Sequence, residues 1–387
     1  MIAYNKEWLD NLYLHKKLAE ARKKNLISIE ELKSCEEKYP VCFYMPNFFV
    51  RIGLLLLTVV IAIFSFGLIA MMTNVTYSGS FSGLLLFFAL ISYGTLEFIV
   101  HAKYHYKSGA DDALIWMTAA FITAAFNLYG DISALQNAII LFSISLYIAL
   151  RFTNMLMSAI ACISLLALVF FSYTRLGEMA KATVPFLIML ISAVIYFIVI
   201  AKQFREKLFR YADCLLMSEI ACLFCLYAAG NYYVVREGSI SMFQLDLKEG
   251  QSISSGWLFW PFTAIIPFIY LAIGIKKKNV VLMRSGLILI PAIIFTVRHY
   301  YSILPADIAM VIGGILMIAI GYSLIKYLRK PKHWFTDEGN DNAPLNTTKQ
   351  LESLIIAQTF AQAAIETNSH TEFGGGSAGG GGAGGDF

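Results

Sequence analysis

The sequence predicts an all-α protein, a polytopic transmembrane helical bundle of about ten spans. Of its 387 residues, 58% are hydrophobic and only 14% are charged, whereas soluble domains carry about 25% charged residues. The few charges leave long runs without Asp, Glu, Lys or Arg. An ionised side chain near the bilayer centre costs about 3 kcal/mol or more, so such runs mark membrane spans. This composition excludes an ordinary soluble domain.

The first segment, 1–47, is predicted to form a cytoplasmic helical hairpin. Asn5 can cap the first helix, and Ser28 with Glu31 forms a capping box that begins the second. Pro40 must end that second helix. A hairpin of this size is too small to be stable alone, so we expect it either to lie on the membrane face or to pack on the cytoplasmic loops.

The transmembrane domain is predicted to cover 48–326. A helix needs about 20 mostly apolar residues to cross the hydrocarbon. The predicted spans are about 53–72, 83–102, 112–129, 134–151, 154–173, 183–201, 212–234, 257–275, 279–298 and 306–325. The ninth span contains Arg284 and Pro291, so it could instead be re-entrant. No convincing internal repeat is recognised.

The placement of Lys and Arg predicts the orientation. Most of them fall in the N-terminal segment, after the last span and in the loops near 101–111, 202–211 and 276–278. Cationic loops are retained in the cytoplasm during insertion. Both termini are therefore expected to be cytoplasmic.

The last span is followed by two further regions. Residues 327–372 read as a cytoplasmic linker and helix, and 373–387 as a flexible Gly-rich tail. The helix and the terminal Phe387 could bind a protein partner. The other expected partners are the lipid bilayer and a small solute or ion; no nucleic acid is expected.

Ionisable groups within spans are the first candidates for a functional site. Glu97, His101 and His105 have the spacing of one helical face near the cytoplasmic end of the second span. Glu219 lies about two turns into the seventh span, at a similar depth. Together these groups could bind a cation or relay a proton. Alternatively, Glu97 pairs with His101 or a loop lysine, His105 lies in water, and Glu219 is protonated or reaches the interface.

A second polar cluster is predicted at the outer face. Asp131 ends the third span, Arg298 and His299 end the ninth, and Asp307 begins the tenth. Such a cluster is either an ordinary interfacial ion pair or a ligand site.

Recognisable catalytic and metal-binding motifs are not found. The sequence lacks the His-Glu-x-x-His, Gly-x-Ser-x-Gly and P-loop patterns. Cys222 and Cys225 share a helix face, but zinc requires more ligands, so they are interpreted as packing residues. No metal or cofactor is predicted. A lipid-modifying enzyme that uses His101 with Glu97 remains open, since such sites have no fixed spacing.

Two short segments resemble a known family. These are Asn25-Leu26-Ile27-Ser28-Ile29-Glu30-Glu31-Leu32 near the start, and Arg298-His299-Tyr300-Tyr301-Ser302-Ile303-Leu304 before the Gly-rich last span. They resemble an uncharacterised family of bacterial polytopic membrane proteins that is classified as a domain of unknown function. The Gly-rich end resembles the tails of TPM-type membrane-anchored proteins. Both resemblances imply a bacterial inner-membrane location.

The preferred functional hypothesis is a transporter or channel for a small solute or ion, with Glu97 and Glu219 at its polar site. One alternative is a structural or sensory membrane protein that acts through its cytoplasmic tails. The other is a lipid-modifying membrane enzyme.

Overall fold

The computed structural model confirms an all-α helical bundle. It describes residues 2–23, 26–73, 78–130, 132–243, 253 and 255–300, and scattered positions between 308 and 326. The chain divides into two units, 1–343 and 344–387, and all described residues belong to the first. The helices are α1 (Lys6–Lys23), α2 (Ile29–Lys38), α3 (Phe48–Met72), α4 (Ser78–Ala102), α5 (Ala110–Tyr129), α6 (Ala134–Phe152), α7 (Met155–Tyr173), α8 (Glu178–Ile200), α9 (Lys202–Lys207), α10 (Ala212–Gly230), α11 (Tyr232–Phe243), α12 (Gly256–Lys276) and α13 (Val280–Tyr300), with short 3-10 turns η1 (Thr174–Leu176) and η2 (Phe209–Tyr211).

Nine helices among the described residues are long and apolar enough to cross a membrane. They are α3 to α8, α10, α12 and α13, and they coincide with the first nine predicted spans. Most of the predicted tenth span, 306–325, lies outside the described residues, as do 327–372 and 373–387. The chain is thus a multi-pass membrane protein by the length and composition of its helices.

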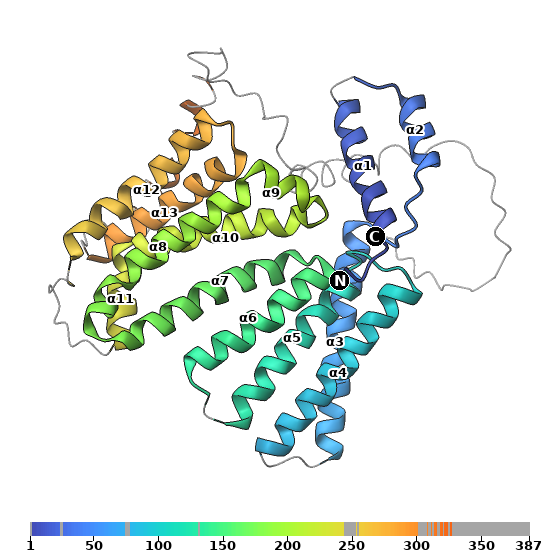
Figure 1. Ribbon diagram of the computed structural model, residues 1–387, viewed down its shortest axis with the longest axis horizontal. Helices are drawn as coiled ribbons and strands as arrows, with labels where there is room; N and C mark the ends of the chain where they lie inside the picture. Colours follow the sequence, from blue (N-terminus) through green and yellow to red (C-terminus); the bar gives the residue numbers. More distant parts are fainter. Residues whose placement is uncertain are drawn as a thin grey trace, which may run out of the picture. The chain divides into compact units, whose positions relative to one another are not determined.

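Consecutive spans pack as helical hairpins. The pairs α4–α5, α6–α7, α8–α10 and α12–α13 make the most extensive contacts, while α3 packs on α5 and α7 lies beside α10 (Figure 1). The α12–α13 pair is especially close at two glycines. A Cβ atom on Gly274 would come within 2.7 Å of the Met283 nitrogen, and one on Gly286 within 2.9 Å of the Pro267 oxygen. Small residues allow this approach in a membrane, where lipid is as apolar as the side chains it replaces.

The predicted seventh span, 212–234, is wrong at its C-terminal end, because α10 stops at Gly230 and a separate helix, α11, follows. Asn231 has the extended conformation φ −82°, ψ 125°. Its side-chain oxygen accepts a hydrogen bond from the Val234 nitrogen (3.2 Å), and its amide donates to Thr296 Oγ1 (3.0 Å). The buried asparagine therefore ends one helix, caps the next and bonds to α13.

The ninth predicted span forms one helix despite its proline. The helix α13 continues through Pro291 for 21 residues, or about 30 Å at 1.5 Å per residue, which is enough to cross the hydrocarbon. Its length therefore supports a full span rather than a re-entrant segment.

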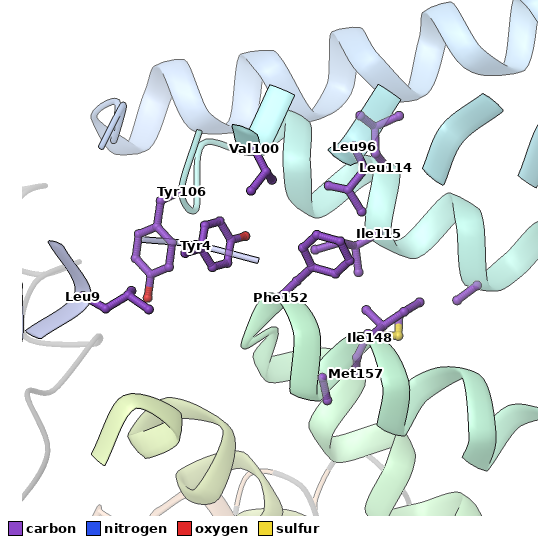
Figure 2. Packing of buried hydrophobic residues seen from close by; sticks show 12 residues of the cluster. Tyr4, Leu9, Leu96, Val100, Tyr106, Leu114, Ile115, Ile148, Phe152 and Met157 are labelled. Atoms are coloured by element: carbon purple, nitrogen blue, oxygen red, sulfur yellow. The ribbon is translucent and has the colours of Figure 1, made fainter. Parts of the chain in front are cut away.

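The N-terminal hairpin has the predicted caps and packs on the loops at one end of the bundle. The capping box of Ser28 and Glu31 is present at the start of α2. Tyr4 is buried, and its ring meets the rings of Tyr106 and Phe152 edge-on, with centroids 4.9 and 6.4 Å apart (Figure 2). Of the two expected positions, packing on the loops is the one observed.

Polar contacts also hold this segment. Asp10 in α1 makes a two-oxygen ion pair with Arg210 of η2, with both distances 2.7 Å. The Ala3 nitrogen donates to the Arg151 carbonyl oxygen at 2.8 Å. The start of the chain is thereby bonded to both the α6–α7 and the α8–α10 hairpins.

Replacing Tyr4 with alanine should release α1. Truncating a buried aromatic side chain costs about 3 kcal/mol or more, so amide hydrogen exchange in α1 should accelerate roughly a hundredfold. Hydrogen-exchange mass spectrometry of the detergent-solubilised protein measures this. Tyr39→Ala, at a more exposed tyrosine that ends α2, is the control; equal exchange in both variants would contradict the docking described here.

Candidate polar site within the helical bundle

Glu97 in α4 is held by an arginine from the neighbouring hairpin. Arg151, in the last turn of α6, donates from Nε to Glu97 Oε1 (2.5 Å) and from Nη2 to Oε2 (2.9 Å). The hydroxyl of Tyr93 donates to Oε1 at 2.7 Å. Such a two-point arginine–carboxylate pair fixes both distance and orientation. Sequence reasoning considered a loop lysine as the partner and missed Arg151.

The structure places only one of the two predicted histidines with Glu97. His101 Nδ1 lies 3.2 Å from Glu97 Oε2. The expectation that His105 shares their helical face is wrong, because α4 ends at Ala102. Tyr104 follows with φ 54°, in the left-handed region that cannot continue a right-handed helix.

His105 instead belongs to the loop between α4 and α5. Its Nδ1 lies 2.8 Å from Ser108 Oγ, and its ring packs on Tyr44 with centroids 4.7 Å apart. Burial lowers the pKa of His105, and Asp111 opposes this shift.

Glu219 is more deeply buried than Glu97, the other predicted site carboxylate that the structure describes. Only 1% of its side chain is exposed, and Arg205 Nη2, in α9, donates to its Oε2. Asn279, between α12 and α13, donates to its Oε1 at 3.3 Å. One carboxylate thus joins α9, α10 and the α12–α13 hairpin. Neither partner was predicted. Arg205 lies 14 residues before Glu219 on another helix, and Asn279 lies 60 residues after it.

Glu97 and Glu219 have no partner in common. The first is bonded to Arg151 and the second to Arg205, so each carboxylate has its own arginine.

A further charged cluster, which sequence reasoning did not single out, lies at the end of the bundle that contacts α1. Asp112 accepts from Arg51 Nη2 (2.5 Å) and from Asn154 Nδ2 (2.9 Å), which joins α3, α5 and the start of α7. Asp213 pairs with Lys107 and lies 4.0 Å from Lys16. Burial lowers the pKa of Lys16, and the charge of Asp213 opposes this shift.

The predicted outer cluster is described only in part. Asp131 and Asp307 lie outside the described residues. Arg298 and His299 occupy the last turn of α13, and the His299 ring meets Tyr233 edge-on at 4.8 Å. His299 therefore packs on α11.

The contact between α7 and α10 reveals an internal repeat, contrary to the expectation of none. The motif Leu-Met-Ser-x-Ile-Ala-Cys occurs at 156–162 and again at 216–222. The two copies are identical at six of seven positions and differ where Ala159 corresponds to Glu219. Comparing the starts of the two helices at a 60-residue offset would have found this signal.

Residues 60 positions apart meet directly across the two helices. Cys214 Sγ donates to the Asn154 carbonyl oxygen (3.6 Å). The Ser158 and Ser218 hydroxyls are 2.9 Å apart, and the Cys162 and Cys222 sulfurs are 3.4 Å apart. We call these three contacts the α7–α10 ladder. Contacts between equivalent residues define a local two-fold axis between two parallel helices, α7 and α10, which pack on each other.

Comparison of the chain with protein-family models, with curated proteins and with solved structures finds no match in any of the three. Within the described part of the chain, no three His, Cys, Asp or Glu side chains gather as a metal site.

Oxidation should join Cys162 to Cys222. Their sulfurs must approach by only about 1.4 Å to reach the disulfide length of about 2.05 Å. In a Cys35→Ser, Cys42→Ser background, diamide treatment followed by tryptic cleavage should leave the fragments containing α7 and α10 linked until reduction.

Cys225→Ser is the matched control for this linkage, because Cys225 lies one turn beyond Cys222 on the same helix. The link should survive Cys225→Ser and disappear in Cys162→Ser. A link that survives Cys162→Ser would contradict the ladder.

Proposed function

We propose that the protein moves a small solute or ion across the membrane and that Glu219, with Arg205, forms its polar site. The observation that carries this proposal is the burial of Glu219 in a membrane-spanning helix with an arginine partner. Ionisable groups at such positions are costly and typically mark ion or substrate pathways. Structural ion pairs also occur there, so the experiment must separate the two roles.

Two further observations support transport. Parallel repeats related by an axis along the membrane normal are common in transporters, whose sites lie at the repeat interface. Glu219 lies in one of the two repeated motifs, where its counterpart is Ala159. The two copies of the motif therefore pack symmetrically, but only the second copy carries a charged residue.

We also infer the orientation and location. The loops 103–109, 201–211 and 277–279 follow the second, sixth and eighth spans, so they lie at the same end of the bundle. All three are rich in Lys and Arg. Positive loops favour the cytoplasm, which supports cytoplasmic termini. The resemblances of the first segment and the tail favour a bacterial inner membrane.

Variants that remove a single carboxylate charge test the proposed site. In liposomes with an entrapped pH-sensitive dye, we expect Glu219→Gln to lower proton-coupled or cation-dependent flux at least tenfold across a panel of monovalent cations, because the neutral amide cannot exchange a cation or proton. Glu97→Gln is the matched control. It also removes an arginine-paired carboxylate, but one outside the proposed site, so it shows the effect of losing such a pair alone. Undiminished flux in Glu219→Gln would reject the site.

The double variant Arg205→Gln, Glu219→Gln separates transport from stability. Removing one partner of a buried pair costs up to about 3–5 kcal/mol, and less here because Arg205 is 34% exposed. Removing both should restore much of the thermal stability. Flux should stay low in the double variant if Glu219 acts in transport, whereas recovery of flux together with stability would show a purely structural pair.

A further inference from the structure

The cysteine contact of the α7–α10 ladder lies deep in the bundle. Cys162 is 7% exposed and Cys222 is fully buried, and their sulfurs are 3.4 Å apart. Cys222 is the eleventh residue of α10, so it lies about 15 Å along the helix axis, near mid-membrane. The two thiols come from equivalent positions of the repeat and face each other across its local two-fold axis.

We propose that Cys162 and Cys222 form a two-sulfur site for a soft monovalent cation such as Cu(I). Thiolate sulfur selects Cu(I) over hard cations. Two ligands that face each other across a two-fold axis suit two-coordinate, linear binding, whereas zinc takes four ligands. As a substrate site, this pair of sulfurs would identify the transported ion as a soft monovalent cation. That role rests on the proposed transport function.

The sulfurs require a modest displacement to hold the ion. Metal–thiolate bonds are about 2.3 Å long for a first-row ion such as zinc, so an ion in line between two sulfurs needs about 4.6 Å. The observed 3.4 Å must therefore widen by about 1.2 Å. The proposal therefore requires the two short side chains to rotate apart when the ion binds.

Charge balance in a low-dielectric site fixes the proton stoichiometry. A net charge at this depth is unfavourable. Binding that keeps the site neutral is RSH + RSH + M⁺ → RS–M–S(H)R + H⁺, where one sulfur–hydrogen bond breaks, two metal–sulfur bonds form and one proton leaves to water. No electron is transferred, and no oxidant or reductant is required. The ion's charge is thus exchanged for that of one proton, as metal binding to thiols generally requires.

The polar rungs of the ladder connect this site with one end of the bundle. Moving toward the start of both helices, the Ser158–Ser218 hydroxyl pair lies one turn from the sulfurs, and the Asn154–Cys214 contact lies one turn further. Oxygen and sulfur atoms thus continue from the helix ends to the thiol pair. Glu219, three residues before Cys222, is the nearest carboxylate in the sequence of α10.

Silver ion is the probe for the site, because it is a soft monovalent cation that needs no reductant. The purified full-length protein with Cys35→Ser and Cys42→Ser is dialysed against Ag⁺ in chloride-free buffer, and bound metal and released protons are measured. We expect one Ag⁺ and about one proton per chain, with at least a tenfold loss of affinity in Cys162→Ser and in Cys222→Ser. Affinity should fall as pH falls.

Cys225→Ser is the matched control and should retain binding. Equal Ag⁺ affinity in Cys162→Ser and its parent would overturn the proposal, as would loss of binding in Cys225→Ser. Circular dichroism of each variant confirms that the helices are intact, so loss of binding cannot be assigned to unfolding.

The binding measurement is independent of transport. Glu219→Gln should still bind Ag⁺ when its flux is lost, because its carboxylate is not a ligand. Binding that persists in a protein without any flux would reject the transport function and keep the site. Cation flux without two-cysteine-dependent binding would keep transport and reject the site.

Discussion

In hydrocarbon a polar side chain can bond only to the protein, and this constraint governs how the spans of this chain pack. Several buried polar groups have a partner on another helix. Glu219 is bonded to Arg205, Ser158 to Ser218, and Asn231 to Thr296. A hydrogen bond between membrane helices contributes only about 0.6 kcal/mol on average. Its larger effect is on specificity, because a different packing would leave a buried group unsatisfied.

The α7–α10 ladder shows how this constraint acts on a repeated sequence. Equivalent small residues meet because two parallel helices with the same motif can pack symmetrically. The single exception within the motif is Glu219, which stands opposite no second carboxylate because its counterpart is Ala159. Two facing carboxylates would repel each other at this depth. The asymmetry allows one charge to pair with Arg205 while the apolar and thiol contacts stay symmetric.

Much of the fold was predictable because the relevant physics is local. Charge-free runs located nine spans, and the Ser28–Glu31 pattern located the start of α2. The helix face proposed for His105 failed because nothing in the local pattern shows that Tyr104 adopts a positive φ. The prediction of where α10 ends was wrong for a related reason, since Asn231 is stabilised by a residue of α13.

The two carboxylates of the candidate site could be predicted from the sequence, but the residues that pair with them could not. Glu97 and Glu219 are conspicuous as carboxylates in apolar runs, but their arginines are brought to them by helix packing. Arg151 and Arg205 read as ordinary basic loop residues in the sequence. The repeat was the one long-range signal that the sequence itself contained, and it places α7 and α10 parallel and in contact.

The parallel orientation of α7 and α10 is the central claim, and labelling from one side of the membrane tests it most directly. Single cysteines are introduced as Leu176→Cys, after α7, and as Lys202→Cys and Lys277→Cys, at the other end of the bundle. In sealed vesicles an impermeant maleimide should label position 176 from one side, and both 202 and 277 from the opposite side. Labelling of 176 and 202 from the same side would show that α8 does not cross the membrane, and the ladder of equivalent residues could not form.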